Sequence, residues 1–70
     1  MNVILLNSHD QWLDTQRVRL MDRRAEHIRM VLRSKQGDTL RVGMLNGQLG
    51  TGRIEAIDAQ AVLMLSLIHI

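Results

Sequence analysis

The sequence predicts a mainly β protein with one α-helix, folded as a small β-barrel. Apolar and polar residues alternate over 17–20 and 39–44, as in strands with one buried face. The stretch 22–38 instead has the apolar spacing of one short amphipathic helix. Asn46-Gly47 joins two strand-like runs, which is a strong hairpin signal. Strands around one helix that end in a three-strand meander close most naturally into a barrel, with the helix at one end or along one side.

The expected strands differ in burial. The runs near both ends of the chain are almost wholly apolar and predict buried strands, whereas the inner runs alternate. The strands are expected over residues 1–6, 17–20, 39–44, 48–57 and 61–67. Asn46-Gly47 fits a type I′ turn, which needs two positive φ angles, and residues 58–60 form a second turn. Gly50 and Gly52 predict a bend or bulge in the fourth strand.

The helix is expected to begin after Asp22 and to stop at Gly37. Asp22 belongs to the residue types that cap helix starts, because its side-chain oxygen accepts from the unpaired amides of the first turn. Cations near the end suit the helix dipole, and Gly37 readily adopts the left-handed conformation that ends helices. The residues expected to pack on the sheet are Ala25, Ile28, Val31 and Leu32. Those expected on the outward side are Glu26, Arg29 and Arg33.

The positive charge is concentrated in the middle of the chain. Residues 17–41 hold eight basic and three acidic side chains, a balance of +5, whereas the remainder holds one basic and four acidic side chains, a balance of −3. Seven of the eight central cations are arginine, which is suited to bidentate phosphate contacts. A solvated face is the alternative interpretation. We predict an RNA-binding surface made of Arg17, Arg19, Arg23, Arg24, Arg29, Arg33, Lys35 and Arg41.

Trp12, His27 and Met30 each raise a question that the sequence leaves open. Trp12, the only aromatic residue, is either a lid over one end of the core or a base-stacking platform, and its isolation favours the lid. His27 is either half-buried and hydrogen-bonded or in contact with RNA. Met30 falls on the polar side of the predicted helix, where a neighbouring domain would be able to cover it.

No pattern in the sequence is typical of a catalytic, cofactor or metal site. The chain has no Cys, and His9, His27 and His69 are not at metal-ligand spacing. Its closely spaced glycines match neither a KH loop, which joins two helices, nor a dinucleotide-binding loop. With no apolar run of about 18 or more residues and no signal-peptide pattern, we expect a cytoplasmic protein.

A longer pattern resembles a known family. It reads His27-x-x-x-Val31-Leu32-Arg33, then Gly37-Asp38, then Leu40-x-Val42. This order and spacing resembles the N-terminal domain of the bacterial 16S rRNA (uracil-N3)-methyltransferases, the RsmE family, over residues 1–64. The resemblance implies a PUA-like β-barrel that docks on 16S rRNA of the small ribosomal subunit. It marks Arg33 as the best RNA contact, with Arg23, Arg24 and Arg29 as helpers.

The same resemblance implies that the chain is part of a larger enzyme. The parent would methylate N3 of one uridine with S-adenosylmethionine (SAM). Its cofactor and catalytic residues would lie in a C-terminal trefoil-knot (SPOUT) domain that also forms a homodimer and is absent here. The 70-residue chain alone would therefore bind no cofactor and be inactive.

The final residues receive a separate interpretation. Residues 65–70 are apolar apart from Ser66 and His69, and their sequence equals one reading frame of a common transposase adapter used in DNA library preparation. We therefore expect residues 65–70 to be a non-native tail on a truncated protein.

The alternative function for the whole domain is a free-standing basic barrel that serves as a protein-interaction module.

Overall fold

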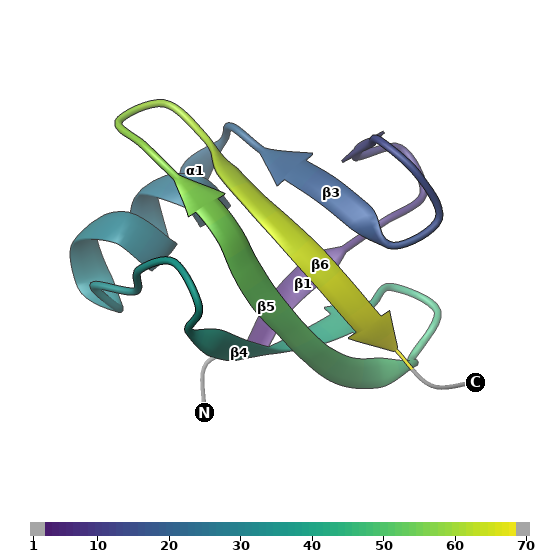
Figure 1. Cartoon of the computed structure of the whole chain (residues 1–70). Helices are drawn as coiled ribbons and strands as arrows, with labels where there is room; N and C mark the ends of the chain where they lie inside the picture. The colour runs from purple at the N-terminus through teal and green to yellow at the C-terminus, as the bar shows by residue number, and fades with distance from the viewer. Residues whose placement is uncertain (1–2, 69–70) are drawn as a thin grey trace.

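Most of the chain forms one curled sheet with a helical segment at one end. The computed structural model describes residues 3–68. Its elements are β1 (Val3–Leu6), β2 (Gln11–Trp12), β3 (Arg17–Leu20), α1 (Arg23–Glu26), the π-helical segment η1 (His27–Val31), β4 (Thr39–Met44), β5 (Leu49–Ile57) and β6 (Val62–Ile68). In Figure 1, β5 and β6 cross the front while β1 lies behind them, so the sheet is curled into a half-barrel. The predicted class, mainly β with a single helix in a small barrel-like fold, is confirmed.

The strand order is β1-β4-β5-β6-β3-β2. β1 pairs with β4 in parallel, and the other neighbouring strands are antiparallel. The two-residue β2 at one edge lies in a stretch that the sequence pattern left without a strand. Residues 65–68, the first part of the expected tail, continue β6. Residues 69–70 of that tail and residues 1–2 of the first expected strand lie outside the described part of the chain.

The core lies on the concave side of this sheet. Its fully buried side chains are Leu6, Val18, Leu20, Ile28, Ile54, Val42, Val62 and Met64. The pairings Ile54↔Met64 and Val18↔Met64 place side chains from three strands in one row. Trp12 packs against this core, and its Nε1–H donates to the carbonyl of Asn7 over 2.8 Å. This placement agrees with the lid interpretation.

The helix begins as predicted but ends early. The Asp22 carboxylate accepts from the amide of Arg24 over 3.0 Å, which caps the first turn. The predicted stop at Gly37 is wrong, because η1 ends at Val31 and Arg33 adopts the left-handed conformation with φ 52°. Gly37, with φ 91°, lies in the later turn before β4.

The π-helical turn changes which residues face the core. The amide of Leu32 donates to the carbonyl of His27, five residues back, over 3.0 Å. A helix of this kind has more residues per turn than an α-helix, so side-chain positions rotate away from the expected face. Ala25 and Ile28 are buried as predicted, but Val31 is 64% exposed and does not dock.

The β4–β5 connection is a hairpin of a different type from the one predicted. The amide of Gly47 donates to the carbonyl of Met44, and Gly47 has φ 100° while Asn46 has no positive φ. These features describe a three-residue loop with a turn followed by a left-handed glycine, so the type I′ prediction is wrong. The position of the bulge also differs, because the register shift in β5 falls between Ile54 and Ala56 and not at the glycines.

Gly52 allows close packing between three strands. A Cβ at this position would lie 2.5 Å from Sδ of Met64 and 2.8 Å from Cγ1 of Val42, and both of these neighbours are fully buried. Any side chain here would force the sheet apart or displace its neighbours. The glycine is therefore required for packing.

Replacing Gly52 with alanine should lower the free energy of unfolding by about 1–3 kcal/mol, the usual cost of overpacking a core. Urea unfolding monitored by circular dichroism measures the change. Thr51→Ala, on the exposed face of the same strand, is the control and should cost at most about 1 kcal/mol. An unchanged unfolding midpoint for Gly52→Ala would contradict the packing argument.

Candidate nucleic-acid interface

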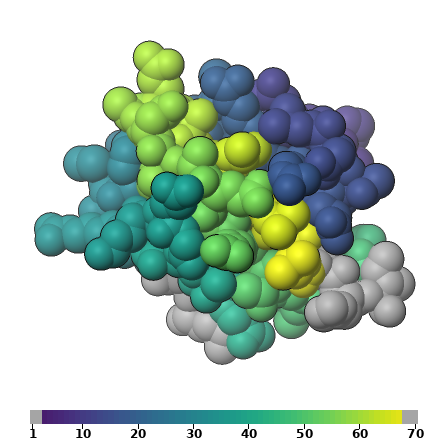
Figure 2. Space-filling model, in the orientation of Figure 1, coloured from purple at the N-terminus to yellow at the C-terminus, as the bar shows by residue number. Residues whose placement is uncertain are grey.

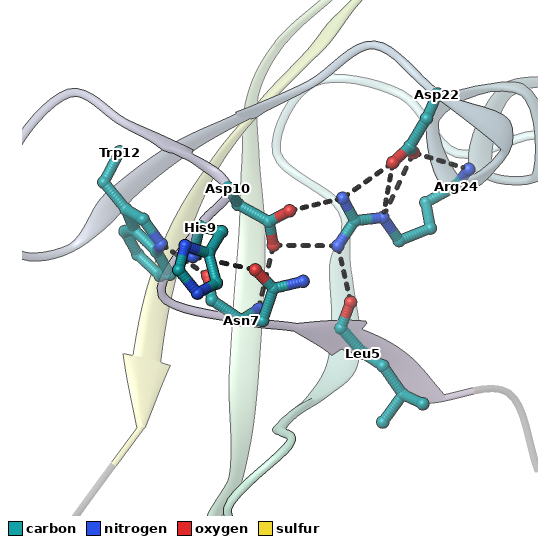
Figure 3. A network of polar contacts seen from close by, with 7 residues as sticks. All are labelled: Leu5, Asn7, His9, Asp10, Trp12, Asp22 and Arg24. Carbon is teal, nitrogen blue, oxygen red and sulfur yellow. Dashed lines mark hydrogen bonds and ion pairs between the residues drawn. The ribbon is translucent and has the colours of Figure 1, made fainter.

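Arg24 is bound on several sides by other parts of the protein. Its Nη2 lies 2.7 Å from Oδ1 of Asp10 and 2.8 Å from Oδ2 of Asp22, and its Nη1 donates to Oδ2 of Asp10 over 2.9 Å. Nη1 also donates to the carbonyl of Leu5 over 2.6 Å. Figure 3 shows the guanidinium lying between these three partners. We call Arg24, Asp10, Asp22 and the Leu5 carbonyl the Arg24 clamp.

The clamp is partly shielded from water. The Asp10 side chain is only 9% exposed and that of Arg24 22%. Hydrogen bonds from Arg24 are the main cause that lowers the pKa of Asp10 and the pKa of Asp22 below the usual aspartate value, and the pKa of Arg24 is raised in turn. These contacts use the donors with which Arg24 would bind a phosphate, so they give Arg24 a structural role.

Arg17 is also ion-paired, but on the surface. Its Nη1 lies 3.0 Å from Oδ2 of Asp14, and its Nε lies 2.7 Å from Oε1 of Glu55. Hydrogen bonds to these two carboxylates raise the pKa of Arg17. The two acidic partners reduce the positive potential that this side chain offers to a ligand.

Arg19 and Arg29 lie near the turn between β5 and β6. Nη1 of Arg29 donates to the carbonyl of Asp58 over 3.2 Å. The pKa of Asp58 is lowered mainly because its carboxylate accepts from the amides of Gln60 and Ala61, and the charges of Arg19 and Arg29 add a smaller effect. These two cations thus share an acidic neighbour.

The remaining predicted cations are exposed: Arg23, Arg33, Lys35 and Arg41. Among residues 3–68, the side chains of these four make no ion pair or hydrogen bond with another residue. Arg23 lies on α1, whereas Arg33 and Lys35 lie in the segment that leads into β4. Arg41 lies on the exposed side of β4. The eight predicted residues therefore come from several elements, and their joint role in RNA binding stays a prediction.

Arg53 is an exposed cation that the sequence argument did not include. It lies on β5 and pairs with Thr39 of β4, next to the pair formed by Arg41 and Thr51. The signal that could have found it is the alternation of β5, which places Thr51 and Arg53 on the exposed side and Gly52 and Ile54 on the buried side. It was missed because it lies beyond the basic stretch 17–41, in a part of the chain with net negative charge.

Other surface features of the described residues include a hollow lined by mixed side chains and a half-buried histidine. A hollow of about 750 Å³ lies at the end of the sheet away from the helix and includes Trp12, Gln16, Met44 and Ser66 in its lining. Within residues 3–68, no group of three or more potential metal ligands comes together, and no helix has the length and apolar character of a membrane span. His27 is half-buried on the helix.

Comparison with known proteins identifies the fold. No family model matches the chain, and no curated protein matches it. A solved structure of "an hypothetical protein" is similar with a TM-score of 0.77 and 15% identity, over 94% of this chain and 28% of that one. The structure of "the putative methyltransferase Lpg2936" from Legionella pneumophila, with bound SAM, is similar with a TM-score of 0.70 and 21% identity, over 94% of this chain and 27% of that one. The chain thus has the fold of a segment found in a methyltransferase-like protein, and spans little more than a quarter of either match.

Removing the Arg24 side chain should destabilise the protein. Arg24→Gln leaves the buried Asp10 carboxylate with the Asn7 amide but without its cationic partner, which we expect to lower the free energy of unfolding by about 1–3 kcal/mol. Arg23→Gln removes the same charge from an exposed neighbouring position and should change it by less than about 0.5 kcal/mol. Equal urea midpoints for the two variants would contradict a structural role for Arg24.

The clamp should also make stability depend on acid pH. Because Asp10 and Asp22 have lowered pKa values in the folded protein, their contribution is fully present above the unfolded aspartate pKa of about 3.9. It is lost as pH falls through the lower folded values. Thermal unfolding between pH 6 and pH 2 should show a steeper acid loss in the wild type than in Arg24→Gln. If the melting temperatures of the wild type and Arg24→Gln fall in parallel with pH, the contacts of Arg24 with Asp10 and Asp22 do not contribute to the acid dependence.

Proposed function

We propose that this chain is the rRNA-docking domain of a SAM-dependent methyltransferase that modifies N3 of a uridine in 16S rRNA. Its fold would be the PUA-like barrel of the RsmE family. The observation that carries the proposal is the fold likeness to about a quarter of the SAM-bound Legionella pneumophila protein, since it relates the chain to one segment of a larger methyltransferase-like protein. The identity of the target base rests on the sequence resemblance alone.

The residues of the family-like pattern occupy one connected region. His27 and Val31 belong to η1, and Arg33 and Gly37-Asp38 follow in the segment that leads to β4. The amide of Gly37 donates to the carbonyl of Ile54, and the amide of Ile54 donates to the carbonyl of Asp38, so this segment is fixed against β5. Such a pattern would position Arg33 at the rim of the sheet, where an RNA backbone would reach it.

The chemistry proposed for this chain is binding. Exposed arginine and lysine side chains spread over a surface suit phosphate and sugar contacts, which position RNA without reading its sequence. The family resemblance assigns SAM and the catalytic groups to another part of the parent enzyme. Dimerisation of the parent would likewise depend on that part.

One observation favours the second candidate, a protein-interaction module. Met30 and Val31 are each 64% exposed on the helical segment and line a hollow of about 420 Å³ together with Arg23 and His27. Exposed apolar side chains of this kind are typical of protein contact sites. A neighbouring domain of the same parent would cover them equally well, so this surface is compatible with both candidates.

Titration of a labelled 16S rRNA fragment with the purified chain tests the proposal. The affinity should fall with salt, with a slope of roughly −0.7 per neutralised phosphate on a log–log plot for single strands. Four contacts would give a slope of about −3. Saturable binding to a protein partner that added rRNA leaves unchanged would favour the interaction module, and absence of RNA binding at low salt would overturn the proposal.

The base specificity requires a separate measurement. Deleting the gene in its host should abolish 3-methyluridine in 16S rRNA, as detected by mass spectrometry of nucleosides. Re-introducing the complete parent gene should restore it. Unchanged 3-methyluridine after deletion would contradict the proposed reaction while leaving RNA binding by this chain to be judged by the titration.

A further inference from the structure

Four of the exposed cations lie on or next to the β4–β5 hairpin: Arg33, Lys35, Arg41 and Arg53. On the outer face of the hairpin, Thr39 lies opposite Arg53 and Arg41 lies opposite Thr51. Arg41 and Arg53 are diagonal neighbours on adjacent strands, a relation that separates residues by about 7–8 Å. Two guanidinium groups and two hydroxyl groups therefore share one small area.

The segment before β4 brings two more cations to the same side. The amide of Gly37 donates to the carbonyl of Ile54 over 2.8 Å, and that of Ile54 donates to the carbonyl of Asp38 over 2.9 Å. The Asp38 carboxylate accepts from the amide of Lys35 over 2.9 Å, which closes the turn. In Figure 2 the surface of this segment adjoins that of β5 on the face shown. Lys35 is thus held near the Arg53 end of the hairpin. Arg33 lies at the other end of the same segment, where the amide of Ser34 donates to the carbonyl of Ile28 over 3.1 Å.

Arg41 and Arg53 differ from Arg17 and Arg24 in their acidic neighbours. Arg17 contacts Asp14 and Glu55, and Arg24 contacts Asp10 and Asp22. Within residues 3–68, no carboxylate lies in ion-pair distance of the side chain of Arg41 or Arg53. Unpaired guanidinium groups keep their donors and their charge for an anionic ligand.

We propose that RNA phosphates bind along this cationic strip, made of Arg33, Lys35, Arg41 and Arg53, and that Arg19, Arg23 and Arg24 of the predicted RNA-binding set lie outside the RNA footprint. The inference rests on the proposed rRNA-docking function and adds Arg53 to it. Arg41 and Arg53 donate to phosphate oxygens in the bidentate geometry of arginine, and Thr39 and Thr51 supply hydroxyl donors between them. Because the strip follows an exposed strand pair and is not a deep pocket, it suits a polyanionic backbone.

A pair of double variants tests the assignment. Arg41→Gln/Arg53→Gln removes two charges from the strip, and Arg19→Gln/Arg23→Gln removes two exposed charges outside it. Titrated with the same labelled 16S rRNA fragment, the strip variant should bind about tenfold or more weakly, and its salt slope should fall by about 1.4 in magnitude. The control should lose less than about threefold, since charges away from the contact are screened by salt. Circular dichroism confirms that both variants fold.

A measurement on the unaltered protein covers the case in which the strip variant fails to fold. In NMR spectra of the wild type, the side-chain Nε–H signals of Arg41 and Arg53 should shift on addition of the RNA, while that of Arg24 should not. An equal loss of RNA affinity in both double variants would overturn the strip, and so would NMR shifts confined to Arg19, Arg23 and Arg24. In either case RNA binding by the wild type would leave the docking function intact. Failure of the wild type to bind RNA at all would overturn both.

Discussion

The Arg24 clamp is the interaction on which the rest of the structure depends. In the strand order, β1 and β2 lie at opposite edges of the sheet, so backbone pairing leaves the half-barrel open between them. Arg24 fixes the helix start against the turn that links these two edges, because it binds the Leu5 carbonyl of β1 and the Asp10 carboxylate just before β2. Asp22 adds the helix start to the same group and also caps the helix. A single guanidinium thus connects the end of β1, the turn before β2 and the start of the helix.

This arrangement divides the arginines by role. A basic stretch of chain resembles a uniform cationic surface when only its composition is considered, but ion pairs commit part of it to the fold. Arg24 is committed to the clamp and Arg17 to surface pairs, while Arg41 and Arg53 on the hairpin keep free donors within the described residues. The charge counted along the sequence is therefore higher than the charge available to a ligand near Arg17 and Arg24. On the hairpin the count is too low, because Arg53 comes from a part of the chain with net negative charge.

The features that the sequence predicts correctly are those with a local cause. Alternation identifies β3 and β4, and the residue type of Asp22 identifies the helix start, because each depends on neighbours within a few positions. The π-helical turn, the left-handed Arg33 and the position of the bulge in β5 escape prediction, since tertiary packing selects them. The same holds for the clamp, whose partners Asp10 and Arg24 are 14 residues apart and meet only when the sheet curls.

A double-mutant cycle between Asp10 and Arg24 tests this account most directly. The free energy of unfolding is measured for the wild type, Asp10→Asn, Arg24→Gln and the double variant. If the clamp closes the half-barrel, the losses should fail to add, with a coupling energy of about 1–3 kcal/mol. Additive losses would mean that the two side chains act independently, and would contradict a structure that depends on their contact.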